Sequence, residues 1–304
     1  MGGQEGNDEQ AAPARRPAHF LSFDVEEYFQ VQAAAEGGVA PSEWDGMQRR
    51  LEEPLERILH LLAEHRSSAT FFILGWVARN ERRLVERIAA CGQEIASHGM
   101  GHDMLVRLDR RQFSQELADS RRLLEDISGR PVVGYRAPTF SITRRTAWAI
   151  DVLAEEGFSY DSSVFPIRHD RYGVPQAPPS PHWAVGPAGG RVLEIPPLTV
   201  RLAGRNWPVG GGGYLRLLPA AAVTWALKSA SKTGSPAMLY LHPWELDPGQ
   251  PVLPMSRFTR WRHRVGLGRN EDKLRRLLKS FAFTSVAERL GELRRTVEGS
   301  FVYG

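Results

Sequence analysis

The stretch AHFLSFDVEE, residues 18–27, decides the fold, because it is a short apolar and aromatic run that ends in acidic residues. Such a run is typical of a buried strand, and its acidic end places ionisable groups where the strand stops. A second apolar run, SATFFILGW at 68–76, follows a segment from about Ser42 to His65 in which leucines recur at three- and four-residue steps. The pattern therefore predicts a strand, a helix and a second strand.

Strand and helix patterns alternate along most of the chain. We expect helices at Arg83–Cys91, Phe113–Ile127 and Thr146–Glu156, and strands at QEIASH (93–98), PVVGYRAP (131–138), RVLEIPPL (191–198) and AMLYLH (237–242). This order predicts a mainly parallel sheet or barrel with helices outside. In such barrels active sites gather at the carboxyl ends of the strands, which is where the polar residues described below lie.

The domain organisation follows from changes in composition along the 304 residues. Residues 1–17 are polar and predict a disordered tail, whereas residues 18–250 carry the alternating pattern and predict one large domain. Within it, residues 166–190 are rich in Pro and Gly and predict a long surface excursion. Residues 251–304 predict a basic helical extension packed on the barrel.

Composition excludes several classes of protein. Cys91 is the single cysteine, so neither an intramolecular disulfide nor a cysteine-based zinc site is expected. No window holds the 18 or so apolar residues of a membrane span, and the first 17 residues lack the apolar region of a secretory signal. A net charge of +4 and a pI of about 9.4 do not demand nucleic acid. We expect a soluble cytoplasmic enzyme, for which peripheral attachment to the inner membrane stays open.

The first cluster that could carry chemistry is Asp24 with Glu26. Side chains alternate along a strand, so these two carboxylates face one way while Glu27 faces the other. Two carboxylates this close repel one another unless a cation or a shared proton relieves the repulsion. A solvated acidic strand end remains the simpler interpretation of this motif alone.

The second cluster is His98-Gly99-Met100-Gly101-His102, which follows the predicted strand at 93–98. In a helical turn residues i and i+4 share a face, so both imidazoles could bind one ion. Two imidazoles and one carboxylate would leave metal positions open for water and substrate, as in a catalytic site. A chance HxxxH remains the alternative.

Two further motifs follow later strands. Arg136, in YRAPTF, could lower the pKa of a nearby carboxylate, and Pro138 could aim the N–H of Thr139 into the cavity. His242, in LYLHPWE, follows the last predicted strand and could act as a general acid, with Trp244 as a wall for sugar stacking. The alternatives are a common Arg-x-Pro turn and a histidine that caps a strand.

The order of these motifs resembles one family. SFDVE, SHGMGH, RAPTF, YDSS and LYLHPWE occur over residues 20–245 in the order seen in the polysaccharide deacetylases, carbohydrate esterase family 4, also called the NodB homology domain. GGGYLRLLP (211–219) and the tail motifs HPWELDPGQPVLP, RWRHRVGLGR and KLRRLLKSFAF resemble the subfamily associated with the PEP-CTERM/exosortase exopolysaccharide system.

The resemblance implies an α/β fold, a distorted (β/α)7-type barrel with a C-terminal helical extension, and one divalent metal ion, usually zinc. It implies that the ion is held by Glu26, His98 and His102. The other roles that it implies are Asp24 as general base, Arg136 as the residue that steers Asp24, the Thr139 N–H as part of an oxyanion hole, His242 as general acid, Asp161 as a residue that tunes or orients a catalytic group, and Phe140 and Trp244 as substrate contacts.

The sequence departs from the family pattern at two places. Most members carry adjacent aspartates (TFDDG), whereas here the second carboxylate is Glu26, one residue further on, and Glu27 is the alternative ligand. The aromatic residue that usually follows the proline is Thr139, and Phe140 comes one step later.

The resemblance implies that the enzyme hydrolyses N-acetyl groups of amino sugars in an exopolysaccharide or its precursor. The expected partners are an N-acetylated polysaccharide or oligosaccharide and the exopolysaccharide assembly machinery, without nucleic acid. Hydrolysis of a cyclic amide or imide is the main alternative, because barrels with this type of metal site host it. A carbohydrate-binding module with a decayed site is disfavoured, since the candidate catalytic residues are all present. A protein that docks on membrane or nucleic acid through its basic tail is the third alternative.

Overall fold

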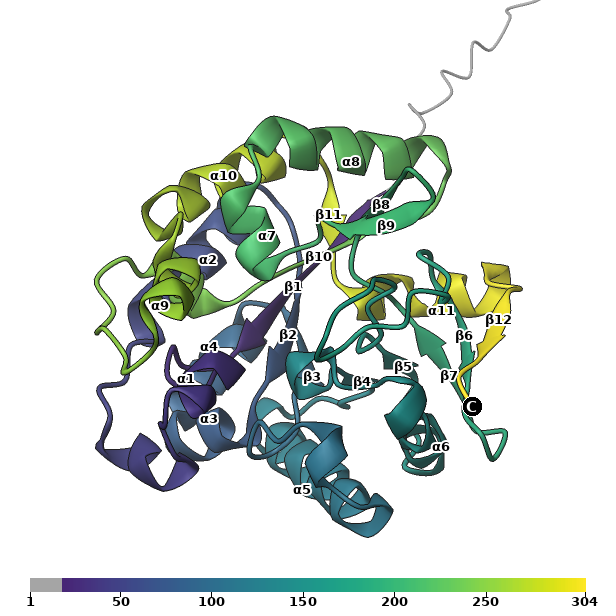
Figure 1. The fold of residues 1–304 in the computed structure, drawn as a ribbon, viewed down its shortest axis with the longest axis horizontal. Coiled ribbons are helices and arrows are strands. Elements are labelled where there is room, and N and C mark those ends of the chain that lie inside the picture. The colour runs from purple at the N-terminus through teal and green to yellow at the C-terminus, as the bar shows by residue number, and fades with distance from the viewer. Residues whose placement is uncertain (1–17) are drawn as a thin grey trace, which may run out of the picture.

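The structure, a computed structural model, describes residues 18–304, and the predicted tail at 1–17 lies outside the described residues. Parallel strands form its centre and helices pack around them (Figure 1). The strands are β1 (His19–Val25), β2 (Thr70–Ile73), β3 (Glu94–Ser97), β4 (Gly134–Tyr135), β5 (Tyr160–Asp161), β6 (His182–Val185), β7 (Arg191–Glu194), β8 (Thr199–Leu202), β9 (Arg205–Pro208), β10 (Met238–Leu241), β11 (Phe283–Thr284) and β12 (Ser300–Val302).

The main sheet has the order β10-β1-β2-β3-β4-β5-β7-β6-β12. All pairs from β10 to β7 are parallel, whereas β6 pairs antiparallel with β7. Just after β7 the chain returns to the first strand of this order, where Pro197 forms a parallel bridge with Met238 of β10. The predicted α/β fold with a mainly parallel sheet is therefore confirmed, and the bridge at Pro197 links the segment just after β7 to β10.

The helices occupy the outside of this sheet (Figure 1). They are α1 (Gln32–Glu36), α2 (Glu52–Glu64), α3 (Gly75–Asn80), α4 (Arg82–Ala90), α5 (Arg110–Ser128), α6 (Trp148–Glu155), α7 (Gly212–Leu217), α8 (Ala220–Lys232), α9 (Arg257–Arg264), α10 (Leu267–Ser280) and α11 (Val286–Thr296). The predicted helix from Ser42 begins only at Glu52, because Pro54 is tolerated in a first turn and not in a helix interior. Across residues 18–304 we find no helix with the length and apolar character of a membrane span.

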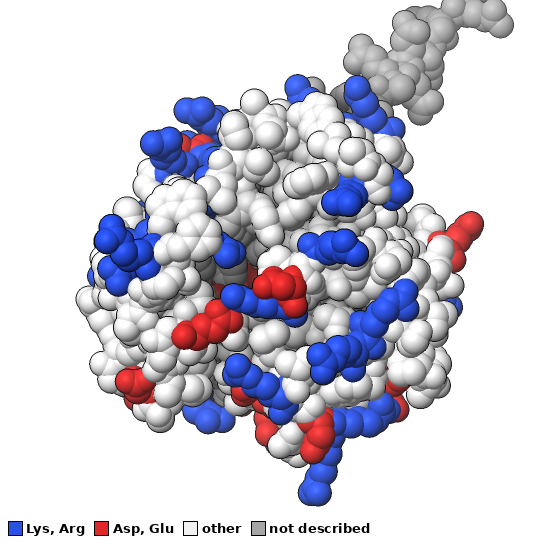
Figure 2. Space-filling model, viewed as in Figure 1, with Lys and Arg blue, Asp and Glu red and all other residues white. Residues whose placement is uncertain are grey.

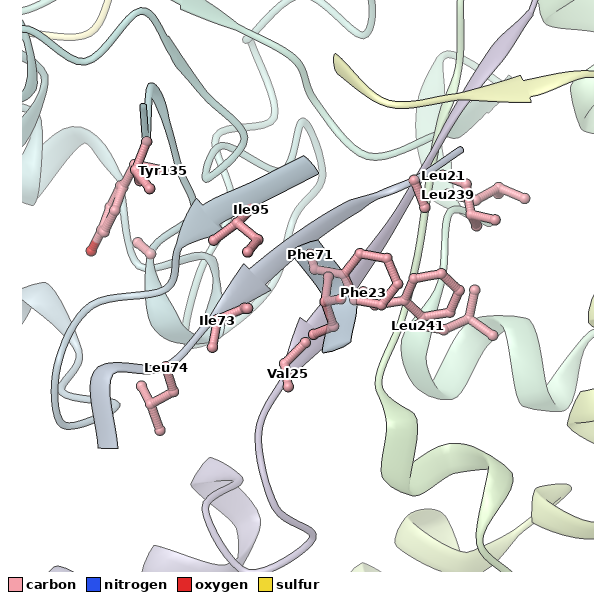
Figure 3. Close-up of a cluster of buried hydrophobic side chains, with 14 of the residues drawn as sticks. Leu21, Phe23, Val25, Phe71, Ile73, Leu74, Ile95, Tyr135, Leu239 and Leu241 are labelled. Carbon is pink, nitrogen blue, oxygen red and sulfur yellow. The ribbon is translucent and has the colours of Figure 1, made fainter. Parts of the chain in front are cut away.

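Alternation along β1 separates a packing face from a chemical face. Leu21, Phe23 and Val25 lie in the large core between sheet and helices, where Phe23 stacks on Phe71 of β2 with ring centroids 5.1 Å apart (Figure 3). Phe20 points the other way, into a smaller cluster shared with other strands. Asp24 follows this second face, so the strand carries its carboxylate toward the inside of the fold.

Two expectations need correction. The predicted surface excursion at 166–190 contains β6, which pairs with β7 and whose His182 side chain is buried against Tyr303. The segment 251–304, expected to be a helical extension, also supplies strands to the main sheet: β11 pairs with β1, and β12 pairs with β6. Short strands of two to four residues carry little periodic signal, which is why the sequence pattern did not predict them.

We predict that the C-terminal segment stabilises the whole fold. Leu277 of α10 is buried in the main core, so Leu277→Ala should lower the free energy of unfolding by about 2–5 kcal/mol. Urea denaturation checks this, with the exposed Lys279→Ala in the same helix as a control that should stay within about 0.5 kcal/mol. Equal effects of the two substitutions would contradict the prediction.

Candidate metal centre and active site

A cavity of about 470 Å³ opens where β1, β3 and β10 end. It brings together most of the predicted site residues, which are Asp24, Glu26, His98, His102, Thr139, Phe140, His242 and Trp244. These residues come from segments far apart in the sequence. The expectation that polar residues meet at the carboxyl ends of parallel strands is confirmed.

Glu26, His98 and His102 form a three-residue cluster. One ligand atom from each lies within 4.8 Å of the others. Nδ1 of His98 donates a hydrogen bond to the carbonyl oxygen of Arg136 at 2.8 Å, so its Nε2 is left facing Glu26 Oε2 at 4.0 Å. Nε2 of His102 lies 2.6 Å from the same carboxylate oxygen. A hydrogen bond from the second ring nitrogen to a backbone carbonyl is the usual way in which a protein fixes a histidine ligand.

The chemistry of this cluster fits a divalent metal. Glu26 Oε2 is buried and, despite its closeness to His102, has no partner with hydrogen-bond geometry among the described residues. Burial opposes ionisation of Glu26, yet the neighbouring imidazole of His102 lowers the carboxyl pKa to about 2. Burial also lowers the pKa of His98 to about 4. Near neutral pH these are the ionised carboxylate and neutral imidazole that a metal ligand set requires.

The two histidines meet through a loop and not through the helical turn that their spacing suggested. Residues 98–102 have no helical assignment. Gly99 has a φ of 77° and His102 a φ of 58°, and these left-handed residues curl the chain so that the two imidazole centroids lie 5.6 Å apart. Glycine adopts such a φ without strain, whereas histidine does so only when its surroundings hold it there.

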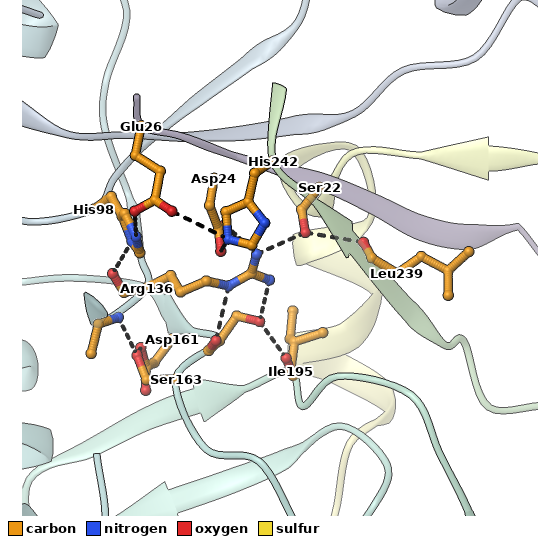
Figure 4. A network of polar contacts seen from close by, with 12 residues as sticks. Ser22, Asp24, Glu26, His98, Arg136, Asp161, Ser163, Ile195, Leu239 and His242 are labelled. Carbon is orange, nitrogen blue, oxygen red and sulfur yellow. Dashed lines mark hydrogen bonds and ion pairs between the residues drawn. The ribbon is translucent and has the colours of Figure 1, made fainter. Parts of the chain in front are cut away.

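Arg136 and Asp24 form a buried ion pair next to the cluster (Figure 4). One guanidinium nitrogen of Arg136 lies 2.6 Å from Asp24 Oδ1 and donates also to Ser22 Oγ at 2.9 Å. The remaining nitrogens donate to the backbone oxygen and the hydroxyl of Ser162. Asp24 is thereby held with one oxygen on Arg136 and the other 3.9 Å from His242 Nε2.

His242 faces both carboxylates from β10. Its Nε2 lies 3.5 Å from Glu26 Oε1 and 3.9 Å from Asp24 Oδ2, and its Nδ1 lies 3.2 Å from Glu245 Oε2. Burial opposes the charged imidazolium, but the hydrogen bond and charge of Glu245 outweigh it and raise the pKa of His242 to about 9. A protonated histidine at this position could donate a proton into the cavity.

Three other predicted residues lie as follows. Thr139 lines the cavity in a left-handed conformation, with φ 57°, and Phe140 packs edge-on against Tyr240. Asp161 does not contact His242: it accepts a hydrogen bond from Ser163, whose oxygen in turn accepts the N–H of Ala137. Asp161 therefore supports the turn that follows Arg136, and Glu245 is the carboxylate beside His242.

The expected sugar-stacking role of Trp244 needs correction. The indole stacks on His242 with centroids 5.1 Å apart and on His263 with centroids 4.6 Å apart. Because both rings stack on the indole and Trp244 is only 6% exposed, little of its surface is available to a sugar. Its Nε1 instead donates to Glu26 Oε1 at 3.3 Å, so Trp244 holds a candidate metal ligand.

Glu27, the alternative ligand, lies outside the cluster. Its carboxylate accepts the backbone N–H of Arg50 at 2.8 Å, just before α2 begins. Sequence reasoning also missed Glu245 and Arg216, which form a buried ion pair behind His242. Glu245 lies three residues after His242, which is the spacing of a capping box. This spacing was the sequence signal that could have predicted their contact.

Comparisons with known proteins found related sequences. The family profile described as "Polysaccharide deacetylase" matches residues 44–159, and one described as a domain of unknown function (DUF3473) matches residues 162–291. The chitooligosaccharide deacetylase of Rhizobium leguminosarum bv. trifolii is 31% identical over 131 residues, which are 43% of this chain and 50% of that protein. The peptidoglycan deacetylase of Helicobacter pylori is 27% identical over 113 residues, 37% of this chain and 38% of that protein. The chain thus spans half or less of these relatives.

Solved structures share the fold. A Mycobacterium smegmatis protein described as a polysaccharide deacetylase superposes with a TM-score of 0.62 at 20% identity, covering 95% of this chain and 94% of that one. Puue allantoinase superposes with a TM-score of 0.60 at 17% identity, covering 93% and 91%. These identities establish a common fold and nothing about substrate. The profile match and the curated relatives together show that residues 44–159 resemble the polysaccharide deacetylase family in sequence.

Proposed function

We propose that this protein is a metal-dependent hydrolase that removes N-acetyl groups from amino sugars of an exopolysaccharide or its precursor. The observation that carries the proposal is the meeting of three different groups in one cavity. These are the candidate ligands Glu26, His98 and His102, the Asp24–Arg136 pair, and His242. An amide hydrolase needs a base for water, a stabiliser for the oxyanion and an acid for the leaving amine.

In this proposal Glu26, His98 and His102 hold one divalent ion. We propose zinc, because histidine nitrogens and a carboxylate oxygen are typical zinc ligands. When bound, such an ion polarises a carbonyl oxygen and lowers the pKa of a bound water. Trp244 keeps Glu26 in place through its indole N–H, and the backbone carbonyl of Arg136 fixes the tautomer of His98.

The proton transfers fall to two side chains beside the cluster, Asp24 and His242. Asp24 accepts a proton from the attacking water, while Arg136 keeps its carboxylate oriented. The N–H of Thr139 faces the oxyanion of the tetrahedral intermediate. His242 then gives its proton to the amide nitrogen as the C–N bond breaks, which yields acetate and a free amino sugar.

Cavity shape favours a saccharide over a cyclic amide, the main alternative. A small cyclic amide calls for a closed pocket, whereas this cavity extends from the metal cluster to Phe258 of α9, whose side chain is 66% exposed. The rim also carries the Arg171–Glu36 ion pair, with its nitrogen and oxygen 2.9 Å apart. An open rim of aromatic and charged groups suits a chain that continues beyond the reacting unit.

The setting that we propose is the cytoplasmic surface of the inner membrane, together with exopolysaccharide assembly machinery. The charge distribution supports this. Residues 251–304 contain 12 Lys and Arg and 5 Asp and Glu, a net +7, whereas residues 1–250 contain 27 and 30, a net −3. Basic side chains lie around the cavity face and over the α9 and α10 side (Figure 2), where Trp261 of α9 is 54% exposed. Exposed aromatic and arginine side chains on one helix suit an anionic lipid surface.

The metal assignment predicts the effect of removing either histidine ligand. His98→Ala and His102→Ala should each lose most of the bound metal after dialysis against a mild chelator, because the two ligands left bind an ion weakly. Elemental analysis measures this, and the exposed His60→Ala serves as a control that keeps its metal. Full occupancy in both site variants would refute the assignment.

The assignment of the base predicts that Asp24→Asn retains the metal while acetate release from N-acetylated oligosaccharides falls by about 10² to 10⁴-fold. The exposed Asp45→Asn should leave acetate release unchanged. If Asp24→Asn loses the metal and Glu26→Gln keeps it, the roles of these two carboxylates are exchanged.

The membrane setting predicts binding to phosphatidylglycerol vesicles that weakens as salt rises. The double variant Arg257→Gln/Arg260→Gln should bind about 30-fold less, since each basic residue near an anionic surface contributes about 1 kcal/mol. Its control is Arg294→Gln/Arg295→Gln on α11, which loses the same charge from another helix. Both variants should deacetylate a soluble oligosaccharide normally. If both variants lose vesicle binding equally, binding depends on net charge alone and the proposed membrane surface at α9 is wrong.

A further inference from the structure

A buried ion pair lies directly behind the candidate general acid. Nε of Arg216 and Oε1 of Glu245 are 2.6 Å apart, and both side chains are almost completely buried. Neither residue has a part in the reaction as described above. Removing two charges from water costs free energy unless each charge is well paired. The fold therefore keeps this ion pair buried despite the cost of desolvation.

The other oxygen of Glu245 fixes His242. Oε2 accepts the backbone N–H of His242 at 3.0 Å and faces its ring Nδ1 at 3.2 Å. These two contacts turn the imidazole so that Nε2 points toward Asp24 and Glu26. With Nδ1 occupied, Nε2 is the nitrogen that can serve the substrate.

Arg216 is itself held by two segments of chain. Its α7 follows Gly211, where an added Cβ would lie only 1.9 Å from the carbonyl oxygen of Tyr240, so this glycine lets α7 approach β10 closely. From the other side, Arg216 donates to the carbonyl oxygens of His263 at 2.5 Å and Val265 at 3.2 Å, at the end of α9. The C-terminal segment thereby reaches His242 through one arginine.

We propose that Arg216 and Glu245 are positioning residues that hold the His242 ring in its proton-donating orientation, and that the segment around α9 supports this orientation through Arg216. The proposal rests on the function proposed above. It also gives a chemical task to the region matched as a domain of unknown function, since residues 162–291 contain all three side chains.

The test compares Glu245→Gln with Asp247→Asn in the full-length chain. Asp247 lies two residues away and pairs with Arg50 at 2.6 Å without touching His242, so it is a matched loss of one carboxylate charge. Glu245→Gln should lower kcat about 10- to 100-fold with little change in KM or metal content, whereas Asp247→Asn should leave kcat within about twofold. Adding Arg216→Met to Glu245→Gln should lower kcat little further, because both substitutions act through His242.

A second pair of variants and a spectroscopic measurement complete the test. If Glu245→Gln does not fold, Glu245→Asp, which retains the charge but shortens the side chain, is compared with Asp247→Glu in the same way. Nitrogen-15 spectra of histidine-labelled protein should show a hydrogen-bonded Nδ1 proton on His242 in the wild type and in Asp247→Asn, and lose it in Glu245→Gln. A normal kcat in folded Glu245 variants, or an unchanged His242 signal, would overturn the proposal. If the wild-type protein deacetylates no saccharide, but Glu245→Gln still loses the Nδ1 proton signal of His242, the proposed function is refuted and the positioning role stands.

Discussion

The buried guanidinium of Arg136 is the charge on which the site depends. A fully buried arginine is unstable unless its nitrogens find oxygen acceptors, and here Asp24, Ser22 and Ser162 supply them. The guanidinium carbon also lies 4.1 Å from the ring centroid of Phe72, in the range of a cation–π contact. Because β4, from which Arg136 follows, is only two residues long, these side-chain bonds join β1 to the chain after β5 across the mouth of the fold.

A second buried layer lies beneath this one. Asp161 and Glu194 are neighbouring carboxyls: burial raises the pKa of Asp161 to about 6, and burial with the charge of Asp161 raises the pKa of Glu194 well above its usual value. Near neutral pH the pair therefore retains a proton, which limits the repulsion between the two groups. With Ser163, Asp161 braces the turn after Arg136, so the YDSS motif acts on the arginine while Glu245 takes the place beside His242.

The sequence predicted those parts of the site that local pattern determines. Alternation along β1 predicted that Asp24 and Glu26 share one side, and motif order predicted that His98, His102 and His242 share one site, although a loop replaces the helical turn expected for the first two histidines. Contacts between distant segments could not be predicted in this way. Nothing in the local pattern shows that histidine rings cover Trp244, or that β12 pairs with a strand more than a hundred residues earlier. The same holds for Arg216, since its partner Glu245 lies 29 residues further along the chain.

The residues of the candidate site also cross the boundary between the two matched regions. Residues 44–159 contain His98, His102 and Arg136, whereas residues 162–291 contain His242, and Asp24 and Glu26 precede both regions. What joins these pieces is β1, which pairs with β2 on one side and with β10 on the other. The β2 pairing brings the carboxylates to the histidine loop, and the β10 pairing brings them to His242. The site therefore exists only when the C-terminal half is folded against the first strand. This explains why α9 and α10, although remote in sequence from Glu26, His98 and His102, belong physically to the same candidate site.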